Sequence, residues 1–236
     1  MIQKMATTYR KSLQGRTELK HEITKMDCFI LRNRLKHYMQ TDPHVNTRGT
    51  YFIRSVYFDN FDNKVLTEKK EGYLDRDKFR VRLYDYNMSL LHLEKKSKRN
   101  NLTYKQKCLI TASEYEKLRH GDINWMEFDS RSLLRELYIQ MSLYQLKPIT
   151  VVDYEREVFI YPHGNVRVTF DSNIKTSFRN NDLLNPKLPM VETDTDAVIL
   201  EVKYDHYLPD IIKQLLQLGD RLKGTYSKYQ ICRMYG

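Results

Sequence analysis

The sequence predicts an α+β protein in which eight antiparallel strands close into a tunnel with flanking helices. Three observations lead to this fold class. About eight segments alternate apolar and polar side chains, short polar connections join most of them, and three other segments have the period of amphipathic helices. With only 8 glycines and 6 prolines in 236 residues, there is little linker material. We therefore expect a single domain over residues 16–236, preceded by an N-terminal extension over residues 1–15.

Three helices are predicted from apolar periodicity and from residues that begin or end helices. Residues 24–39 start at Thr24, a suitable N-cap, and stop before the TDPH segment. The apolar side chains expected near one face of this helix are Met26, Ile30, Leu35, Tyr38 and Met39. Residues 130–146 form the second helix, and residues 209–223 form the third, between Pro209 and Gly224.

The eight predicted strands lie between these helices. Their ranges are 17–23, 51–59, 77–86, 90–98, 103–110, 149–161, 165–171 and 197–205.

Several of these strands carry charge on one side only. In DKFRVRLYDY, residues 77–86, one face has two arginines, since successive strand side chains point to opposite faces. The side chains on that face are Lys78, Arg80, Arg82 and Tyr84, opposite Phe79, Val81 and Leu83. Similar alternation places Glu18, Lys20 and Glu22 together, and likewise Glu94, Lys96 and Lys98, Arg167, Thr169 and Asp171, and Glu201, Lys203 and Asp205, with Lys105 and Lys107 as a further basic pair.

A solvated outer face explains any one such strand. Six together favour a sheet that curls on itself, so that the charged face becomes a lumen and the helices pack on the apolar exterior. Arg80 and Arg82 repel each other unless an anion lies between them, and a guanidinium matches the geometry of phosphate. Carboxylates among many cations suit a polyanion that binds together with Mg²⁺ or Mn²⁺.

Composition excludes several classes of protein. A net charge of +10 implies polyanionic partners, such as nucleic acid, an acidic membrane surface or phosphorylated molecules. The three separated cysteines indicate a reducing compartment, and the seven histidines show no metal-binding spacing. There is no P-loop motif, no signal-peptide pattern and no apolar run near the ~20 residues of a membrane span, so we expect a cytoplasmic protein.

The motifs of this chain also carry a family resemblance. In order, they read RTELKHEI, YFIRSVYFDN, FRVRLY, LEKKSK, YERE, VRVTFD, LEVKYD and TYSKYQICR. Their order and spacing resemble the VTC domain, the polyphosphate polymerase branch of the CYTH or triphosphate tunnel metalloenzyme superfamily, over roughly residues 16–233.

The resemblance implies a tunnel that binds ATP with Mn²⁺ or Mg²⁺ and transfers its terminal phosphoryl group to inorganic polyphosphate. The implied substrate-binding residues are Lys20, Arg80, Arg82, Lys96, Lys107, Tyr154, Arg156, Arg167, Lys203, Ser227 and Lys228. Five of them, Lys20, Arg80, Arg82, Lys203 and Lys228, are expected to act in catalysis. Glu201 is the implied metal ligand, with Glu18 as a second candidate. No nucleic acid is expected, and a peripheral membrane partner is compatible with the resemblance.

Some positions keep a second interpretation. Glu201 could instead pair with a lysine of a neighbouring strand. Arg54 shares its face with apolar side chains, which suits a structural ion pair as well as a substrate contact. Tyr154 and Arg156 share a face with Val152 and Val158, which fits a charged lumen poorly. Two positions before Ser227 the family often has a basic residue, where this chain has Thr225.

Three functions remain open at this stage. The first is an ATP-dependent polyphosphate polymerase, in which positioning and cations suffice because the acceptor is already an anion. The second is a tunnel triphosphatase, which would use Glu18, Glu22 or Glu94 to orient a water molecule. The third is a non-catalytic polyanion-binding protein, which would display its cations on an outer face.

Overall fold

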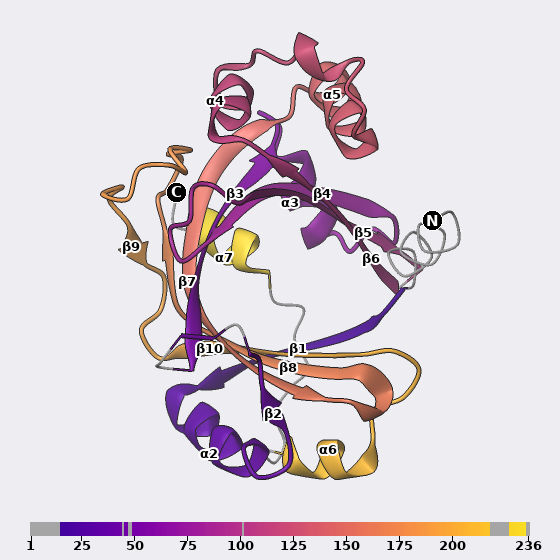
Figure 1. Cartoon of the computed structure of the whole chain (residues 1–236), viewed down its shortest axis with the longest axis vertical. Helices are drawn as coiled ribbons and strands as arrows, with labels where there is room; N and C mark the ends of the chain where they lie inside the picture. The colour runs from indigo at the N-terminus through magenta and orange to yellow at the C-terminus, as the bar shows by residue number, and fades with distance from the viewer. Residues whose placement is uncertain (1–14, 44, 47–48, 101, 218–226, 235–236) are drawn as a thin grey trace.

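The computed structural model of the chain describes residues 15–43, 45–46, 49–100, 102–217 and 227–234 (Figure 1). Its strands are β1 (Thr17–Thr24), β2 (Gln40–Thr41), β3 (Thr50–Asp59), β4 (Arg76–Tyr84), β5 (Leu91–Arg99), β6 (Leu102–Ile110), β7 (Lys147–Tyr161), β8 (Val166–Thr176), β9 (Val191–Glu192) and β10 (Ala197–Tyr204). Its helices are α2 (Lys25–Leu35), α3 (Lys64–Lys70), α4 (Ala112–His120), α5 (Ser132–Tyr144), α6 (Asp210–Leu215) and α7 (Lys228–Met234), with short 3₁₀ turns η1 (Asn124–Met126) and η2 (His163–Asn165).

Eight long strands form one antiparallel sheet in the order β1-β10-β8-β7-β3-β4-β5-β6, which confirms the predicted fold class. The short strands β2 and β9 pair with β7 and β8. Arg16 and Thr103 join the two ends of the sheet through backbone hydrogen bonds of 3.2 and 3.4 Å. This pair closes the ring of strands that is seen end-on in Figure 1.

Apolar side chains on the outside of the ring form two separate hydrophobic cores. One lies between β1, β8, β10 and the helix α2, around Leu31, Val168 and Leu200. The other lies between β4, β5, β7 and the helices α4 and α5, around Leu83, Leu93 and Leu134. Figure 1 shows these two groups of helices on opposite sides of the ring. The alternation along the strands thus leaves the charged side chains on the inside.

Helix α2 begins as predicted but differs in length and in its buried face. Thr24 caps it, in a capping box with Asp27. The helix ends at Leu35 rather than Met39, and the expected apolar face is wrong for Met26, Ile30 and Tyr38, which are exposed. The packed face is instead that of Cys28, Leu31 and Leu35, because these side chains meet the apolar side of β8 and β10.

The other helices also depart from the prediction. The second predicted helix is two residues shorter at each end, as α5, and only α6 is helical within the described part of 209–223. Its predicted end at Gly224 lies outside the described residues. Helices α3, α4 and α7 were not predicted, although Thr111 and Glu114 form a capping box at α4. None of the helices in the described residues has the length and apolar character that a membrane crossing requires.

Helix α7 is unlike the exterior helices because it lies within the ring of strands (Figure 1). It contacts β7, β8 and α3. The hydroxyl of Tyr229 donates a hydrogen bond of 2.6 Å to the buried carboxylate of Asp59, which also accepts from the backbone N–H groups of Val65 and Leu66 at the start of α3. Asp59 therefore ties α7 and α3 to the end of β3.

Candidate functional site

The interior of the ring contains a cavity of about 540 Å³, lined by side chains from all eight long strands, from α3 and from the start of α7. All thirteen residues expected to bind substrate or metal line it, which is what a lumen-facing arrangement predicts. This group includes Tyr154 and Arg156, whose strand was expected to fit poorly. Their roles in binding and catalysis remain predictions.

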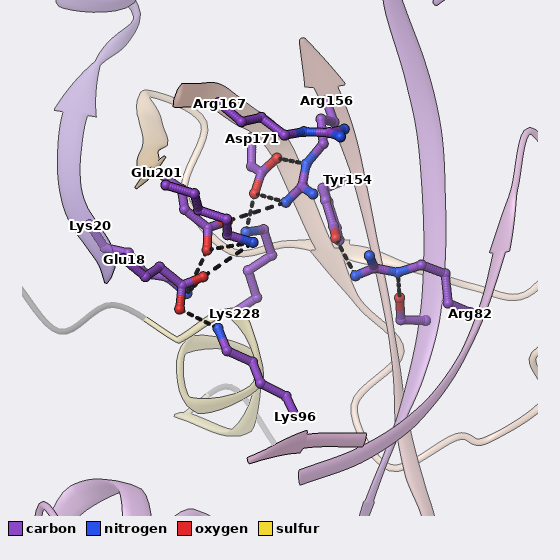
Figure 2. Close-up of polar contacts among 12 residues, drawn as sticks. Glu18, Lys20, Arg82, Lys96, Tyr154, Arg156, Arg167, Asp171, Glu201 and Lys228 are labelled. Atoms are coloured by element: carbon purple, nitrogen blue, oxygen red, sulfur yellow. Dashed lines mark hydrogen bonds and ion pairs between the residues drawn. The ribbon is translucent and has the colours of Figure 1, made fainter. Parts of the chain in front are cut away.

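Two carboxylates share a set of lysines on one wall of the cavity (Figure 2). Glu201 lies 3.5 Å from the Nζ atom of Lys20 and 3.3 Å from that of Lys203. Glu18 lies 3.3 Å from the same Nζ atom of Lys203 and forms an ion pair with Lys96. Burial alone would raise the pKa of Glu18, but Lys20, Lys96 and Lys203 hold it well below its usual value.

A second acidic group lies beside the first, at Asp171. Its fully buried carboxylate accepts two hydrogen bonds from Arg156, of 2.5 and 2.7 Å, and forms an ion pair with Lys228 of α7. Arg156 also reaches Glu201 at 3.6 Å, and the Lys228 Nζ atom lies 4.7 Å from the centroid of the Tyr154 ring. Asp171 therefore connects α7 to the wall that carries Glu201.

The two arginines of β4 are held by protein groups. The Arg80 guanidinium donates to Glu94 at 2.7 Å and to the Tyr57 hydroxyl at 3.2 Å. Arg82 is buried and donates to the Ser55 hydroxyl at 3.0 Å and to the Tyr154 hydroxyl at 2.6 Å (Figure 2). Glu94 lies 3.8 Å from Arg82 as well, so it supplies an anion between the arginines. A bound phosphate is thus not needed to keep these two cations together.

Lysine side chains that lie close together in a buried space have lowered pKa values. Burial, with the charges of Lys228 and Lys203, lowers the pKa of Lys20 to about 8, despite the opposing effect of Glu18. Burial, with the charges of Lys20 and Arg76, lowers the pKa of Lys78 to about 7. Anions that enter the cavity will favour the charged forms of these lysines.

A comparison with protein families settles the resemblance. A family model described as the VTC domain matches residues 15–235. The chain belongs to the VTC domain family. A comparison with curated proteins found no match.

Solved structures are similar to this VTC domain in fold. The PH1819 protein of Pyrococcus horikoshii OT3 is 12% identical, with a TM-score of 0.50 over 94% of this chain and 99% of that chain. A protein of Bacillus halodurans titled a putative adenylate cyclase is 12% identical, with a TM-score of 0.49 over 94% of this chain and 87% of that chain. At this identity the first similarity shows the fold alone.

Glu201 and Glu18 are the candidates in this VTC domain for holding a divalent cation. The ion pairs of Glu201 are long, at 3.3 to 3.6 Å, and the buried Glu18 Oε1 atom contacts Lys203 and Lys20 at 3.3 and 3.9 Å without a hydrogen bond of good geometry. The described residues contain no cluster of three or more His, Cys, Asp or Glu side chains for a metal. The donor set therefore fits a Mg²⁺ or Mn²⁺ ion that takes its remaining ligands from phosphate oxygens and water, as Mg²⁺ commonly does.

Several residues that line the cavity or bind its cations were not assigned a role from the sequence. Asp171 and Glu94 were seen only as members of charged strand faces, although each holds an arginine of the cavity. Tyr57 was missed because β3 is buried on both faces, so its sequence shows no alternation that marks a lumen side.

The sequence left the roles of two further positions open, those of Arg54 and Thr225. Arg54 is a structural residue: it is buried, and its guanidinium donates to both oxygens of Asp153 at 2.9 and 2.7 Å. Thr225 lies outside the described residues.

Proposed function

We propose that this VTC domain is an ATP-dependent polyphosphate polymerase. The family and the tunnel fold make it a phosphate-handling enzyme of the tunnel type. The finer proposal is that it moves the terminal phosphoryl group of ATP to a growing chain of inorganic polyphosphate. The bond between the γ-phosphorus and its bridging oxygen to the β-phosphate breaks, a terminal oxygen of the chain bonds to that phosphorus, and ADP leaves.

The ion pairing of the carboxylates with neighbouring cations is the observation that carries this proposal. Hydrolysis needs a group that orients and deprotonates water, and the best general base has a pKa near the working pH. In this cavity the pKa values of Glu18, Glu94 and Asp171 are all held below their usual range by neighbouring cations, against the effect of burial. Such carboxylates are poor bases. A polyphosphate acceptor needs no base, because its terminal oxygens are already anionic at neutral pH.

Cations of the cavity would position the reacting phosphates. Arg80 and Arg82 present guanidinium groups from β4. Lys20 of β1 and Lys203 of β10 present ammonium groups from the strands on the opposite side of the ring, and Lys228 reaches in from α7. Fixed positive charge around a phosphoryl group stabilises its transition state and costs no reorganisation when the reaction occurs. Substrate phosphates would take over contacts that Glu18 and Glu94 make with these cations.

VTC domains depend in general on a divalent metal ion. Held by Glu201 and Glu18, such an ion would neutralise charge on the phosphate oxygens and polarise the transferring group. Glu201 would otherwise repel the substrate that its neighbours attract.

A product assay tests the proposal. The purified protein is incubated with ATP and Mn²⁺, and ³¹P NMR distinguishes internal phosphates of a chain from orthophosphate. We expect ADP and long-chain polyphosphate in the sample with metal, and no turnover with EDTA. Orthophosphate equal to the ADP formed would instead identify a triphosphatase, and binding of polyphosphate without any turnover would identify a polyanion-binding protein.

A further inference from the structure

Aromatic side chains gather at one end of the cavity, beyond the arginines of β4. Tyr84 follows Arg82 on the same face of the strand. The centroid of its ring lies 5.8 Å from that of Tyr51 and 6.1 Å from that of His92, both in edge-to-face geometry. The Tyr51 hydroxyl accepts a hydrogen bond of 2.8 Å from Arg167. Two aromatic rings of the cavity wall therefore lie directly beside a phosphate-binding candidate.

The opposite end of the cavity has a different chemical character. Lys78 and Lys98 extend from β4 and β5, and Lys69 of α3 joins them. Burial, with the charges of Arg76 and Lys98, lowers the pKa of Lys69, which shows how closely these cations approach one another. None of these three lysines forms an ion pair with a carboxylate among the described residues. The two ends of the cavity thus differ, with aromatic rings at one end and, at the other, lysines that form no direct ion pair within the described residues.

The ring of Tyr84 packs partly against the hydrophobic core and also borders the cavity. It is half-buried and lines the cavity, and the Arg82 guanidinium carbon lies 5.8 Å from its centroid. In the described part of the chain its hydroxyl makes no hydrogen bond. Tyr154 in the same cavity is the contrast, since it is buried and its hydroxyl accepts from Arg82. Tyr84 therefore offers a rigid aromatic surface to a ligand.

The geometry points to Tyr84, supported by Tyr51, as the subsite for the nucleobase of the phosphoryl donor. A base stacked against Tyr84 places its ribose and first phosphate toward Arg82 and Arg167. The distance from Tyr84 to Arg82 along the strand is roughly 7 Å, two residues at ~3.4 Å each. The remaining phosphates then extend along β4 toward Arg80 and Lys78. This inference rests on the proposed function and adds to it the end of the tunnel at which the nucleoside binds.

Stacking on an aromatic ring gives this subsite a measurable signature. Base–aromatic stacking tolerates any base and contributes appreciably to affinity, while an inorganic phosphate chain gains nothing from it. The ratio of affinities for ATP and for inorganic triphosphate therefore reports the subsite, because both ligands share the phosphate contacts.

The test measures the dissociation constants of ATP and of inorganic triphosphate by calorimetry at one Mg²⁺ concentration. Tyr84→Leu keeps apolar bulk and removes the ring, so ATP should bind about tenfold more weakly, with triphosphate changed less than about twofold. Tyr84→Phe keeps the ring and should bind both ligands like the wild type. Tyr38→Leu, at an exposed tyrosine outside the cavity, is the matched control.

The outcomes separate the two proposals. If Tyr84→Leu weakens both ligands equally, or weakens neither, Tyr84 only packs against its neighbours and the nucleobase subsite is wrong, while phosphate binding stands. If the wild type binds neither ligand, the proposed function itself fails, and the subsite fails with it.

Discussion

The carboxylates of the cavity are few, and each lies among several cations. Glu201 differs from the others because its contacts with Lys20, Lys203 and Arg156 are all longer than a normal hydrogen bond. Its oxygens are therefore the ones that a further cation can approach most readily. This property leads to a prediction that separates metal binding from ion pairing.

Glu201→Gln should lower the rate of metal-dependent turnover at least about a hundredfold, while the protein still folds. Without metal, the variant should bind triphosphate as well as or better than the wild type, because a repulsive charge is gone. With Mn²⁺ that advantage should disappear. Calorimetry with and without the metal checks both statements. Turnover that persists with Mn²⁺ would show that Glu201 is only a salt-bridge partner, and Glu18 or Glu94 would become the candidates for the metal.

Arg54 and Asp153 provide a contrasting pair outside the cavity. Both side chains are buried, so Asp153→Asn leaves a guanidinium without its charge partner and should lower the free energy of unfolding by about 3 to 5 kcal/mol. Urea denaturation measures this loss. At low temperature, where the variant is folded, triphosphate affinity should be unchanged. Asp182→Asn, at the more exposed pair with Arg119, should cost under about 1 kcal/mol. If Asp153→Asn bound triphosphate more weakly than the wild type, Arg54 would again be a candidate for substrate contact.

The lysines with lowered pKa values couple binding to pH. Lys20 and Lys78, with pKa values of about 8 and about 7, are partly neutral at pH 8 in the free protein. Bound phosphate favours their charged forms, so binding should take up protons at pH 8, and affinity should fall as the pH rises from 7 to 9. Calorimetry in two buffers of different ionisation enthalpy gives the number of protons. Proton release on binding would contradict this assignment.

At the scale of whole elements, α7 stands out because it is short and yet carries two contacts with the interior of the sheet. Lys228 pairs with Asp171, and Tyr229 bonds to Asp59. Its first turn therefore supplies a cation to the cavity, while its second side chain fixes the helix to β3 and α3. The position of the cation depends on how the helix is anchored.

Lys228→Ala should weaken ATP binding by roughly tenfold and lower turnover further, because a cation is lost beside Tyr154 and Arg156. Asp171 keeps both bonds to Arg156, so the fold should survive. Titration of ATP and a turnover assay measure the two effects. Lys213→Ala, on the exposed face of α6, is the control for loss of one positive charge. If the two variants had the same ATP affinity and turnover, α7 would not be part of the substrate site.

The strands could be predicted from the sequence far better than the helices. The ranges of the eight long strands agree with the structure to within about two residues, except that β8 continues to Thr176, because alternation persists over most of these strands. The two-residue strands β2 and β9 were not predicted. Short helices leave weaker signals. For α4 the capping residues Thr111 and Glu114 were readable, whereas α7 owes its position to contacts such as Tyr229 with Asp59, which no local pattern encodes.

The candidate site was predictable in its composition but not in its pairing. Alternation and the family resemblance together selected thirteen substrate and metal residues, and all of them line the cavity, whereas Glu22 does not. Which cation pairs with which carboxylate depends on approaches across the tunnel, such as Lys96 with Glu18, 78 positions apart. Such a pair follows only from the closed sheet. The anion between Arg80 and Arg82 was expected from a ligand, but Glu94, the direct cross-strand neighbour of Arg80, supplies it.

For the molecule as a whole, closure of the sheet rests on Arg16 and Thr103. Thr103→Pro removes the backbone N–H that donates to the Arg16 carbonyl at 3.4 Å, so β1 and β6 should separate. We expect faster hydrogen exchange in both strands and a loss of about 2 to 3 kcal/mol of stability. Thr103→Val keeps the N–H and should leave both quantities near the wild-type values. Unchanged exchange in the proline variant would show that the seam is held elsewhere.

The acidic side chains inside the tunnel act as built-in counterions. Glu18, Glu94 and Asp171 already neutralise cations that would otherwise hold salt anions from solution. When a phosphate chain binds, its oxygens therefore replace these carboxylates as partners of the cations. Fewer salt anions are released from the protein than from a basic surface of equal charge that lacks carboxylates. Its affinity should consequently fall less steeply with ionic strength than the number of cations in the cavity suggests. A polyanion can therefore remain bound in such a tunnel at a salt concentration at which it would dissociate from an open basic patch.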